Sequence, residues 1–353
     1  MAYTTIKKPS DYFDTRTYSA SGAGSVSDVS FQPDFLWFKN RTVAGDHGLM
    51  DAVRGVNKIM HSNDTNAEVT SNGTTNITAF TSNGFTYGAS SLLDTGSGTP
   101  VTWLWKANGA GSANTDGSIS STVSASATSG FSIVSYTGNG VDGASIGHGL
   151  VNPNLSIIKR RDGAGQSWNV NGYPNTALFA NDGDTLNLNT TAALSDSATK
   201  EIDLSTDSGT TCTFVDAGND INLSGATFIG YFFKNIKGYS KVGSYTGNGS
   251  TDGTFVYLGF KPAFLIVKRT DATSNWRLWD STRNTFNVAD KLLFPDTSDQ
   301  ELTSSSYYMD LLSSGFKIRN TNTDINASGG SYMYMAFAEN PFVTSTGVPA
   351  TAR

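Results

Sequence analysis

One nine-residue pattern occurs three times in this chain of 353 residues and constrains its fold more than any other feature. The copies span residues 31–39, 151–159 and 260–268. Each has a hydrophobic residue two positions before a proline, then a nearly unbroken apolar run, and a lysine six positions past the proline. Proline fixes φ and lacks a backbone donor, so it belongs at the start of a strand, and a continuous apolar run favours a strand covered on both faces. We predict three equivalent strands buried on both faces, which return to solvent at Lys39, Lys159 and Lys268.

The spacing of these copies predicts three related units. The lysines lie 120 and then 109 residues apart, far more than a solenoid repeat and about the length of one β-sandwich. Charged residues make up 15% of the chain, and Gly, Ser, Thr and Asn separate short apolar runs, which indicates many strands and turns. We therefore predict an all-β protein of three tandem β-sandwich units of jelly-roll or lectin-like type. The predicted parts are an N-terminal arm (1–17), unit 1 (18–108), a Gly/Ser/Thr/Asn-rich linker (109–129), unit 2 (130–237), unit 3 (238–342) and a C-terminal tail (343–353).

The three units are expected to begin and end alike and to differ in the middle. Units 2 and 3 open with close copies of one hairpin signal, Ser135-Tyr-Thr-Gly-Asn-Gly140 and Ser244-Tyr-Thr-Gly-Asn-Gly249. Their last strands align Trp105, Phe233 and Phe337. Within the linker, residues 118–123 have enough β-branching to form a strand added to a neighbouring sheet.

Composition excludes several classes of function. A net charge of −6 argues against nucleic-acid binding, which needs a basic groove. Cys212 is the single cysteine, so no intrachain disulfide and no cysteine-rich metal site is expected. The first ten residues have no apolar core of a secretory signal, and the apolar runs are far shorter than the ~20 residues that span a bilayer. We expect a protein made in the cytoplasm, without membrane insertion.

Several motifs along the chain resemble a repeated domain of bacteriophage virion proteins, especially those of marine phages. They are Pro33–Arg41, Asp51–Gly55, His61–Asn63, Trp103–Ala107, Thr115–Ile119, Phe131–Gly140 and Ala336–Phe342. The resemblance implies a tail-fibre, tail-associated or head-decorating subunit that is assembled into the virion with other virion proteins. A homotrimer is expected by resemblance to phage fibres, and because neighbours would order the polar arm and linker.

No motif of catalysis or metal binding stands out. His47, His61 and His148 lack metal-ligand spacing, and no nucleophile triad or phosphate-binding loop is present. We predict no enzymatic activity, no cofactor and no metal. The acidic turns at 182–184 and 219–220 could supply oxygen ligands to calcium, but Asx turns, in which the side chain bonds nearby backbone, are the favoured interpretation.

Four aromatic residues in the divergent middles are the best candidates for ligand contact. Tryptophan and tyrosine rings stack on sugar rings, and each stacked ring contributes ~0.5–1.5 kcal/mol beyond area burial, which suits multivalent adhesion. The alternative is that these rings form a second layer of hydrophobic core. The tentative glycan-binding residues are Trp168, Tyr173, Trp276 and Trp279.

The sequence therefore predicts a virion structural protein. Its leading role is a tail fibre, spike or head-decoration subunit that contacts host-surface glycans. The first alternative is a purely architectural protein that binds only other virion proteins, and the second is a glycan-degrading enzyme. Whether the chain belongs to the head or the tail stays open.

Overall fold

Strands make up nearly all the regular structure of the protein, which confirms the all-β prediction. The computed structural model describes residues 4–90, 92–93, 98–172, 178–181, 183–197, 200, 202–204, 209–215, 218 and 220–341. In this part of the chain the helices are the short 3-10 helix η1 (Pro9–Asp11) and α1 (Thr323–Asn326). No helix described there has the length and apolar character that crossing a membrane requires.

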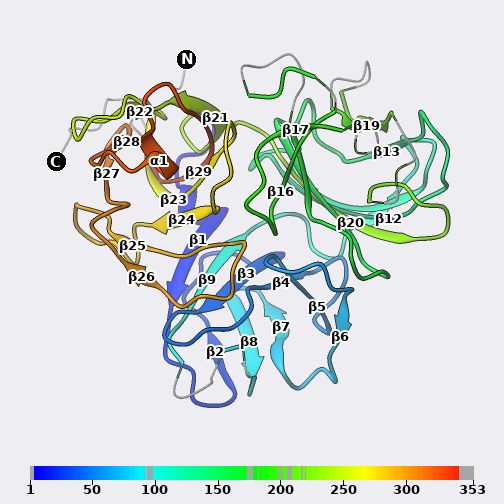
Figure 1. Cartoon of the computed structure of the whole chain (residues 1–353). Coiled ribbons are helices and arrows are strands. Elements are labelled where there is room, and N and C mark those ends of the chain that lie inside the picture. The colour runs from blue at the N-terminus through cyan, green and yellow to red at the C-terminus, as the bar shows by residue number, and fades with distance from the viewer. Residues whose placement is uncertain are drawn as a thin grey trace.

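Three large antiparallel sheets contain four neighbouring strands in the same order (Figure 1). We call each part of the chain that contains one copy of the repeated strand a segment. From one side of the sheet to the other, the four strands are the first strand of the segment, its last strand, the repeated strand, and the strand that follows the repeated strand. In the first large sheet they are β1 (Phe13–Thr17), β9 (Pro100–Trp105), β3 (Phe35–Asn40) and β4 (Gly48–Asp51). In the second they are β12 (Phe131–Thr137), β20 (Thr227–Phe233), β14 (Leu155–Arg160) and β15 (Asn169–Gly172). In the third they are β21 (Ser240–Thr246), β29 (Ser331–Pro341), β23 (Phe260–Arg269) and β24 (Arg277–Asp280).

Each large sheet is accompanied by a small three-stranded sheet, again with one order of strands. The small sheets are β2 (Gly24–Val26), β8 (Gly84–Gly88) and β7 (Asn76–Thr81); β13 (Ser145–Gly147), β19 (Thr211–Phe214) and β18 (Ile202–Asp203); and β22 (Phe255–Tyr257), β28 (Gly315–Ile318) and β27 (Met309–Leu312). The remaining strands extend the first large sheet, extend the second, or form a separate pair. They are β5 (Lys58–His61) and β6 (Val69–Thr70); β10 (Ser112–Asn114), β11 (Ser121–Ser126), β16 (Asp184–Asn187) and β17 (Ser195–Asp196); and β25 (Lys291–Leu292) with β26 (Leu302–Thr303).

The repeated strands occupy equivalent places and are buried on both faces, as predicted. Within each large sheet the residue two positions past the proline pairs with the predicted aromatic residue of the closing strand. These pairs are Phe35 with Trp105, Leu155 with Phe233, and Phe264 with Phe337. The alignment made from the sequence therefore holds at the level of strand register.

The two faces of a repeated strand enter two different hydrophobic clusters. On β3, Phe35 and Trp37 face a cluster to which all three large sheets contribute, whereas Leu36 and Phe38 face the small sheet. Strand β23 does the same with Phe264 and Ile266 on one face and Leu265 and Val267 on the other. We call the cluster common to the three large sheets the shared core. In Figure 1 the three groups of strands surround it, the first below, the second to the right and the third to the left.

Truncating one residue of a repeated strand should destabilise the whole chain. Ile266 is 2% exposed within the shared core. Ile266→Ala should therefore lower the free energy of unfolding by about 2–5 kcal/mol, and Ile266→Val by about 0.5–1.5 kcal/mol, as measured by denaturant titration. A loss below about 1 kcal/mol for the alanine variant would contradict the burial of this strand.

Two of the predicted parts differ from the structure. Residues 13–17 were expected to belong to an arm, but they form β1, which pairs with β9 and places Phe13 in the shared core. Residues 109–129 were expected to be a linker, but they contain β10 and β11, and β11 pairs with β12 along six residues. The alternative of an added strand in this stretch was the better interpretation. The C-terminal tail lies outside the described residues.

Candidate functional site

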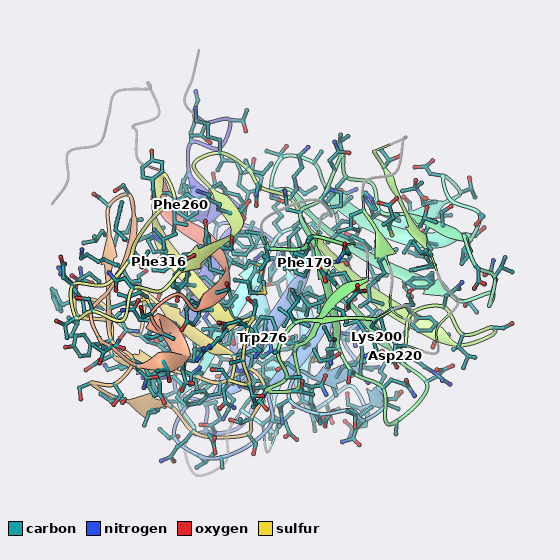
Figure 2. The ribbon with its side chains drawn as sticks, turned by 45° about the horizontal axis from the view of Figure 1, so that its top comes forward. Phe179, Lys200, Asp220, Phe260, Trp276 and Phe316 are labelled. Carbon is teal, nitrogen blue, oxygen red and sulfur yellow. The ribbon has the colours of Figure 1, made fainter. Side chains whose placement is uncertain are left out.

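The aromatic residues proposed for glycan contact are buried. The exposed fractions of Trp168, Trp276 and Trp279 are 0%, 2% and 0%. The indole Nε1 of Trp168 donates to the carbonyl oxygen of His61 at 2.7 Å, and that of Trp276 donates to the carbonyl of Asn187 at 2.9 Å. Trp276 lies in the interior, between the third and second groups of strands (Figure 2). A buried ring has no free face for a sugar, so the expected exposure of these three tryptophans is wrong and the alternative of a core layer holds. Tyr173 lies outside the described residues.

The three lysines that end the repeated strands do not return to solvent, contrary to the prediction. All three are fully buried, and each ammonium donates to two backbone carbonyls. Lys159 Nζ reaches Gln166 O at 2.6 Å in its own segment and Thr65 O at 3.3 Å in the preceding one. The other pairs of acceptors are Asn40 O and Val43 O for Lys39, and Ser274 O and Thr191 O for Lys268. Two of these lysines thus tie neighbouring segments together.

These lysines should make stability rise with pH above neutrality. Burial lowers the pKa of Lys39, Lys159 and Lys268 to about 8 from 10.5, because the ammonium loses hydration. Above pH 8 the unfolded chain therefore binds more protons than the folded one, and the free energy of unfolding increases with pH. We expect a gain of at least about 1 kcal/mol between pH 7.5 and 9.0. Urea titrations at both values measure it; a flat profile or a decrease would contradict the proton balance. The window stops at pH 9 because burial raises the pKa of the Cys212 thiol and of buried tyrosines such as Tyr136 and Tyr231, and these groups together oppose the gain at higher pH.

Three loops close the segments into a ring by the same backbone contacts. The loops span residues 61–68, 187–194 and 294–301, and each lies against the loop that follows the repeated strand of another segment. Two hydrogen bonds occur at every junction. The first set is Glu68 N to Arg161 O (2.8 Å), Leu194 N to Thr270 O (2.8 Å) and Glu301 N to Arg41 O (2.9 Å). The second set is Gly165 N to Thr65 O (2.9 Å), Ser274 N to Thr191 O (2.9 Å) and Gly45 N to Ser298 O (2.7 Å). The last junction joins the third segment back to the first.

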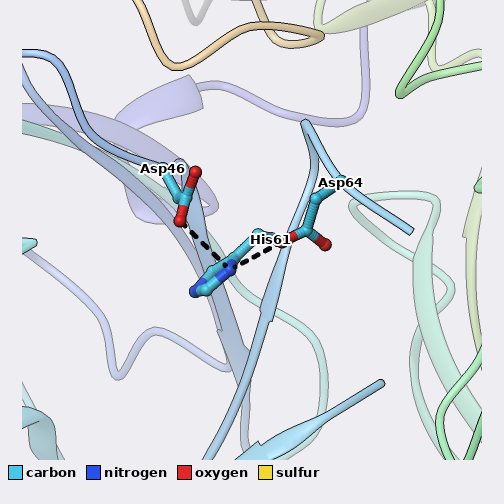
Figure 3. Close-up of side chains that lie close together, drawn as sticks. All are labelled: Asp46, His61 and Asp64. Carbon is cyan, nitrogen blue, oxygen red and sulfur yellow. Dashed lines mark hydrogen bonds and ion pairs between the residues drawn. The ribbon is translucent and has the colours of Figure 1, made fainter. Parts of the chain in front are cut away.

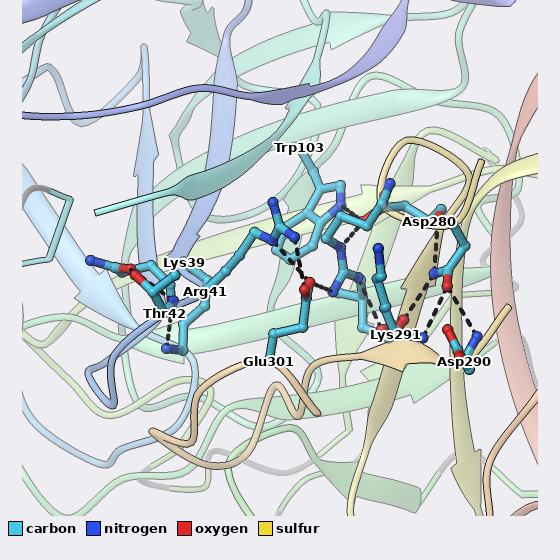
Figure 4. A network of polar contacts seen from close by, with 12 residues as sticks. Lys39, Arg41, Thr42, Trp103, Asp280, Asp290, Lys291 and Glu301 are labelled. Carbon is cyan, nitrogen blue, oxygen red and sulfur yellow. Dashed lines mark hydrogen bonds and ion pairs between the residues drawn. The ribbon is translucent and has the colours of Figure 1, made fainter. Parts of the chain in front are cut away.

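A buried ionic network stabilises the junction between the third and first segments (Figure 4). Arg283 Nε donates to Asp280 Oδ2 at 2.5 Å, and both side chains are fully buried. Arg283 Nη1 also reaches Glu301 Oε2 at 2.9 Å, and Arg41 binds Glu301 through Nε and Nη2 at 2.9 and 2.8 Å. Trp103 Nε1 completes the network by donating to Asp280 Oδ2 at 3.0 Å. Burial raises the pKa of Glu301, but the two arginines outweigh it and hold that pKa below its ordinary value.

The junction between the first and second segments repeats this network with one change. Arg54 bonds Asp51 Oδ2 at 2.5 Å and Glu68 Oε2 at 3.2 Å, while Arg161 binds both oxygens of Glu68 at 3.0 Å. The hydroxyl of Tyr231 donates to Asp51 Oδ2 at 2.8 Å and replaces the Trp103 indole as the donor to the aspartate. At the remaining junction the described residues equivalent to Asp51, Glu68, Arg161 and Tyr231 carry no charge; they are Gly172, Leu194, Thr270 and Met335. These buried charges thus pair with one another between segments.

Asp46, His61 and Asp64 form a separate polar cluster in the first segment (Figure 3). His61 Nδ1 lies 3.1 Å from Asp64 Oδ2 and 3.5 Å from Asp46 Oδ2, and all three side chains are partly buried. Burial raises the pKa of Asp64, but hydrogen bonds from His61 and Asn66 hold it below its ordinary value. Asp46 and His61 also line an open cavity of about 490 Å³. This cluster was not predicted from the sequence, because the spacing from His61 to Asp64 is a weak signal and Asp46 comes near only through the fold.

The other candidates for ligand binding have local partners. Asp184 Oδ2 accepts from the backbone N–H groups of Ala180 and Asn181 at 2.6 and 3.0 Å; both donors precede Asp184, so this is nearby backbone bonding but not the Asx turn that was expected. Asp220 pairs with Lys200 at 3.0 Å, as Figure 2 also places them together. Asp182 and Asn219 lie outside the described residues.

His47 and His148 are fully buried, and burial lowers the pKa of both.

Comparison with known proteins gives a single family. The family model described as a domain of unknown function (DUF7483) matches residues 8–341, nearly the whole chain. No curated protein and no solved structure matches the chain.

Proposed function

The chain belongs to the DUF7483 family, and we propose that it is an architectural subunit of a bacteriophage virion, built from three tandem copies of one β-sandwich. The observation that carries this proposal is the closed ring. The same pair of backbone hydrogen bonds joins each segment to the next, including the third to the first. Such closure favours one rigid block over three independent binding modules.

The proposal of three sandwich units is supported by the order of strands. Each segment has a four-strand core in one order and a small sheet in one order, with a hydrophobic cluster between them. The unit boundaries follow from the opening strands and therefore begin near Phe13, Phe131 and Ser240.

Architecture is preferred to adhesion or catalysis because of where the polar and aromatic groups lie. The three described tryptophans proposed for sugar contact are core residues. The strongest ionic groups, around Arg54 and Arg283, are buried between segments and have mutual partners. A role in host attachment would therefore need a different surface from the one predicted. The virion assignment rests on the motif resemblance described above.

A homotrimer was expected because neighbours would order the arm and linker. Those segments are paired within the chain through β1, β10 and β11, so that reason no longer favours oligomerisation. We propose that a single chain already supplies a threefold arrangement and is a monomer before assembly. Sedimentation equilibrium measures this directly; a stable trimer at micromolar concentration would contradict it.

The virion proposal is tested on purified particles of a phage that encodes this chain. Mass spectrometry should find the protein at a fixed copy number per particle after washing with high salt, and antibody labelling should place it at one position. An adsorption assay with excess purified protein separates the two roles. An architectural subunit leaves adsorption unchanged, whereas competition with the phage for host cells would support adhesion. Absence of the chain from washed particles would contradict both.

A further inference from the structure

We propose that Asp46, His61 and Asp64 bind a divalent transition-metal ion, with Zn²⁺ as the best fit. The site combines one imidazole nitrogen with two carboxylate oxygens, a mixture that suits zinc and its neighbours better than calcium, which prefers oxygen alone. The site lies outside the ionic networks of the ring, and it does not depend on the proposed virion function.

The two separations from the histidine nitrogen match the edges of a coordination tetrahedron. Zinc–nitrogen and zinc–oxygen bonds of 2.0–2.2 Å place neighbouring ligand atoms about 3.3 Å apart. His61 Nδ1 is 3.1 Å from Asp64 Oδ2 and 3.5 Å from Asp46 Oδ2. All three ligand atoms lie within 4.8 Å of one another. A metal can therefore replace the hydrogen between them with only small movements, and the cavity beside Asp46 and His61 leaves room for a water ligand.

Two asparagine amides already hold the carboxylates in place. Asn63 Nδ2 donates to Asp46 Oδ1 at 2.8 Å, on the oxygen that faces away from His61. Asn66 donates through its backbone N–H to Asp64 Oδ1 at 3.0 Å, and through its side chain to one lone pair of Asp64 Oδ2, the proposed ligand atom, at 2.7 Å. Outer hydrogen bonds of this kind orient carboxylate ligands and are a regular part of metal sites.

The repeat provides an independent observation. In the second and third segments, the positions equivalent to these three residues hold other side chains, although the surrounding backbone contacts are the same. In the second segment they are Asn187, Thr190 and, because its loop is one residue longer, the pair Gln166 and Ser167; in the third they are Asn275, Phe294 and Thr297. The first segment therefore departs from the common frame at three positions at once, and all three departures supply ligand groups.

The position of the site suggests what the ion would do. Asp46 follows Gly45, which bonds the third segment, and Asp64 precedes Thr65, whose carbonyl oxygen accepts from Lys159 of the second. A bound ion would fix both loops at the place where the first segment contacts its two neighbours. Metal binding to the folded state alone stabilises it by mass action. We therefore expect saturating Zn²⁺ to raise the melting temperature by at least about 3 °C.

The test uses chelator-treated full-length protein and added ZnCl₂, CoCl₂ or CaCl₂. Calorimetric titration should give one Zn²⁺ per chain, and Co²⁺ should produce the visible absorption of a tetrahedral site. Asp46→Asn and His61→Gln should each weaken Zn²⁺ binding at least tenfold while the metal-free melting temperature stays nearly unchanged. Asn is the residue that the third segment uses at the position of Asp46, so that variant should fold. Asp116→Asn, at an exposed carboxylate elsewhere, is the control and should bind Zn²⁺ as the parent does.

Several outcomes would overturn the proposal. They are an unchanged melting temperature together with no heat of Zn²⁺ binding, equal binding by both ligand variants and the control, or stabilisation by Ca²⁺ equal to that by Zn²⁺.

Discussion

The Trp105→Ala variant should unfold in a single transition that includes all three segments. Its free energy of unfolding should be lower than that of the parent by about 3–5 kcal/mol. The ring of Trp105 is 1% exposed and contacts aromatic residues of all three segments. Its nearest rings are Phe13 and Phe35 in the first segment, Phe131 in the second, and Phe264 and Phe337 in the third, with centroids 4.9–6.4 Å apart. A cavity here removes contacts from every segment, so no segment is left at its original stability.

The chain itself offers the control, Trp105→Phe. Phenylalanine stands at both equivalent positions, Phe233 and Phe337, and Trp105 Nε1 has no hydrogen-bond partner among the described residues. The smaller ring should therefore cost clearly less than the alanine truncation, because it leaves a smaller cavity and no unpaired polar group. Scanning calorimetry with tryptophan fluorescence measures both variants. Two or three separate transitions in the alanine variant, or equal losses for Phe and Ala, would show that the segments fold independently.

The sequence was sufficient to predict the repeat, because the strand signal is local. The proline and the apolar run of each copy specify a two-face-buried strand without knowledge of its neighbours. The opening strand of the first segment was harder to find. Phe13 and Tyr18 have the same spacing as Phe131 and Tyr136, and Phe13 pairs with Trp105 as Phe131 pairs with Phe233. The glycine-rich stretch after Tyr18 hid this similarity.

The burial of the lysines and tryptophans could not be predicted from local patterns, because it depends on contacts between segments. Lys159 meets its acceptor Thr65 across 94 residues, and Lys268 meets Thr191 across 77. The divergent middles looked like variable loops on a fixed scaffold. They diverge instead because each segment packs against different neighbours, so equivalent positions meet different surroundings. Trp168 and Trp276 are equivalent to His47, and all three are interior residues.

The second large effect is expected at Arg283, in the buried ionic network that joins the third segment to the first. Its guanidinium is fully buried between Asp280 and Glu301. Arg283→Met should cost about 3–5 kcal/mol, because it leaves the Asp280 carboxylate buried without its counter-charge, and removal of one partner is far more costly than removal of both. Glu301 retains Arg41, so the loss centres on Asp280.

Removing the second charge should recover much of that loss. The remaining junction holds the same backbone contacts, and its described residues place the uncharged Gly172 at the position of Asp280 and Leu194 at that of Glu301, which indicates that the frame tolerates a junction without these two carboxylates. We expect Arg283→Met/Asp280→Asn to be more stable than Arg283→Met alone, with a coupling energy of at least about 2 kcal/mol in a double-mutant cycle. Trp103 Nε1 can still donate to the side-chain oxygen of the introduced asparagine. Denaturant titrations of the parent, both single variants and the double variant provide the cycle. Additive losses would mean that the two charges do not depend on each other, and the buried pair would then have no part in joining the third segment to the first.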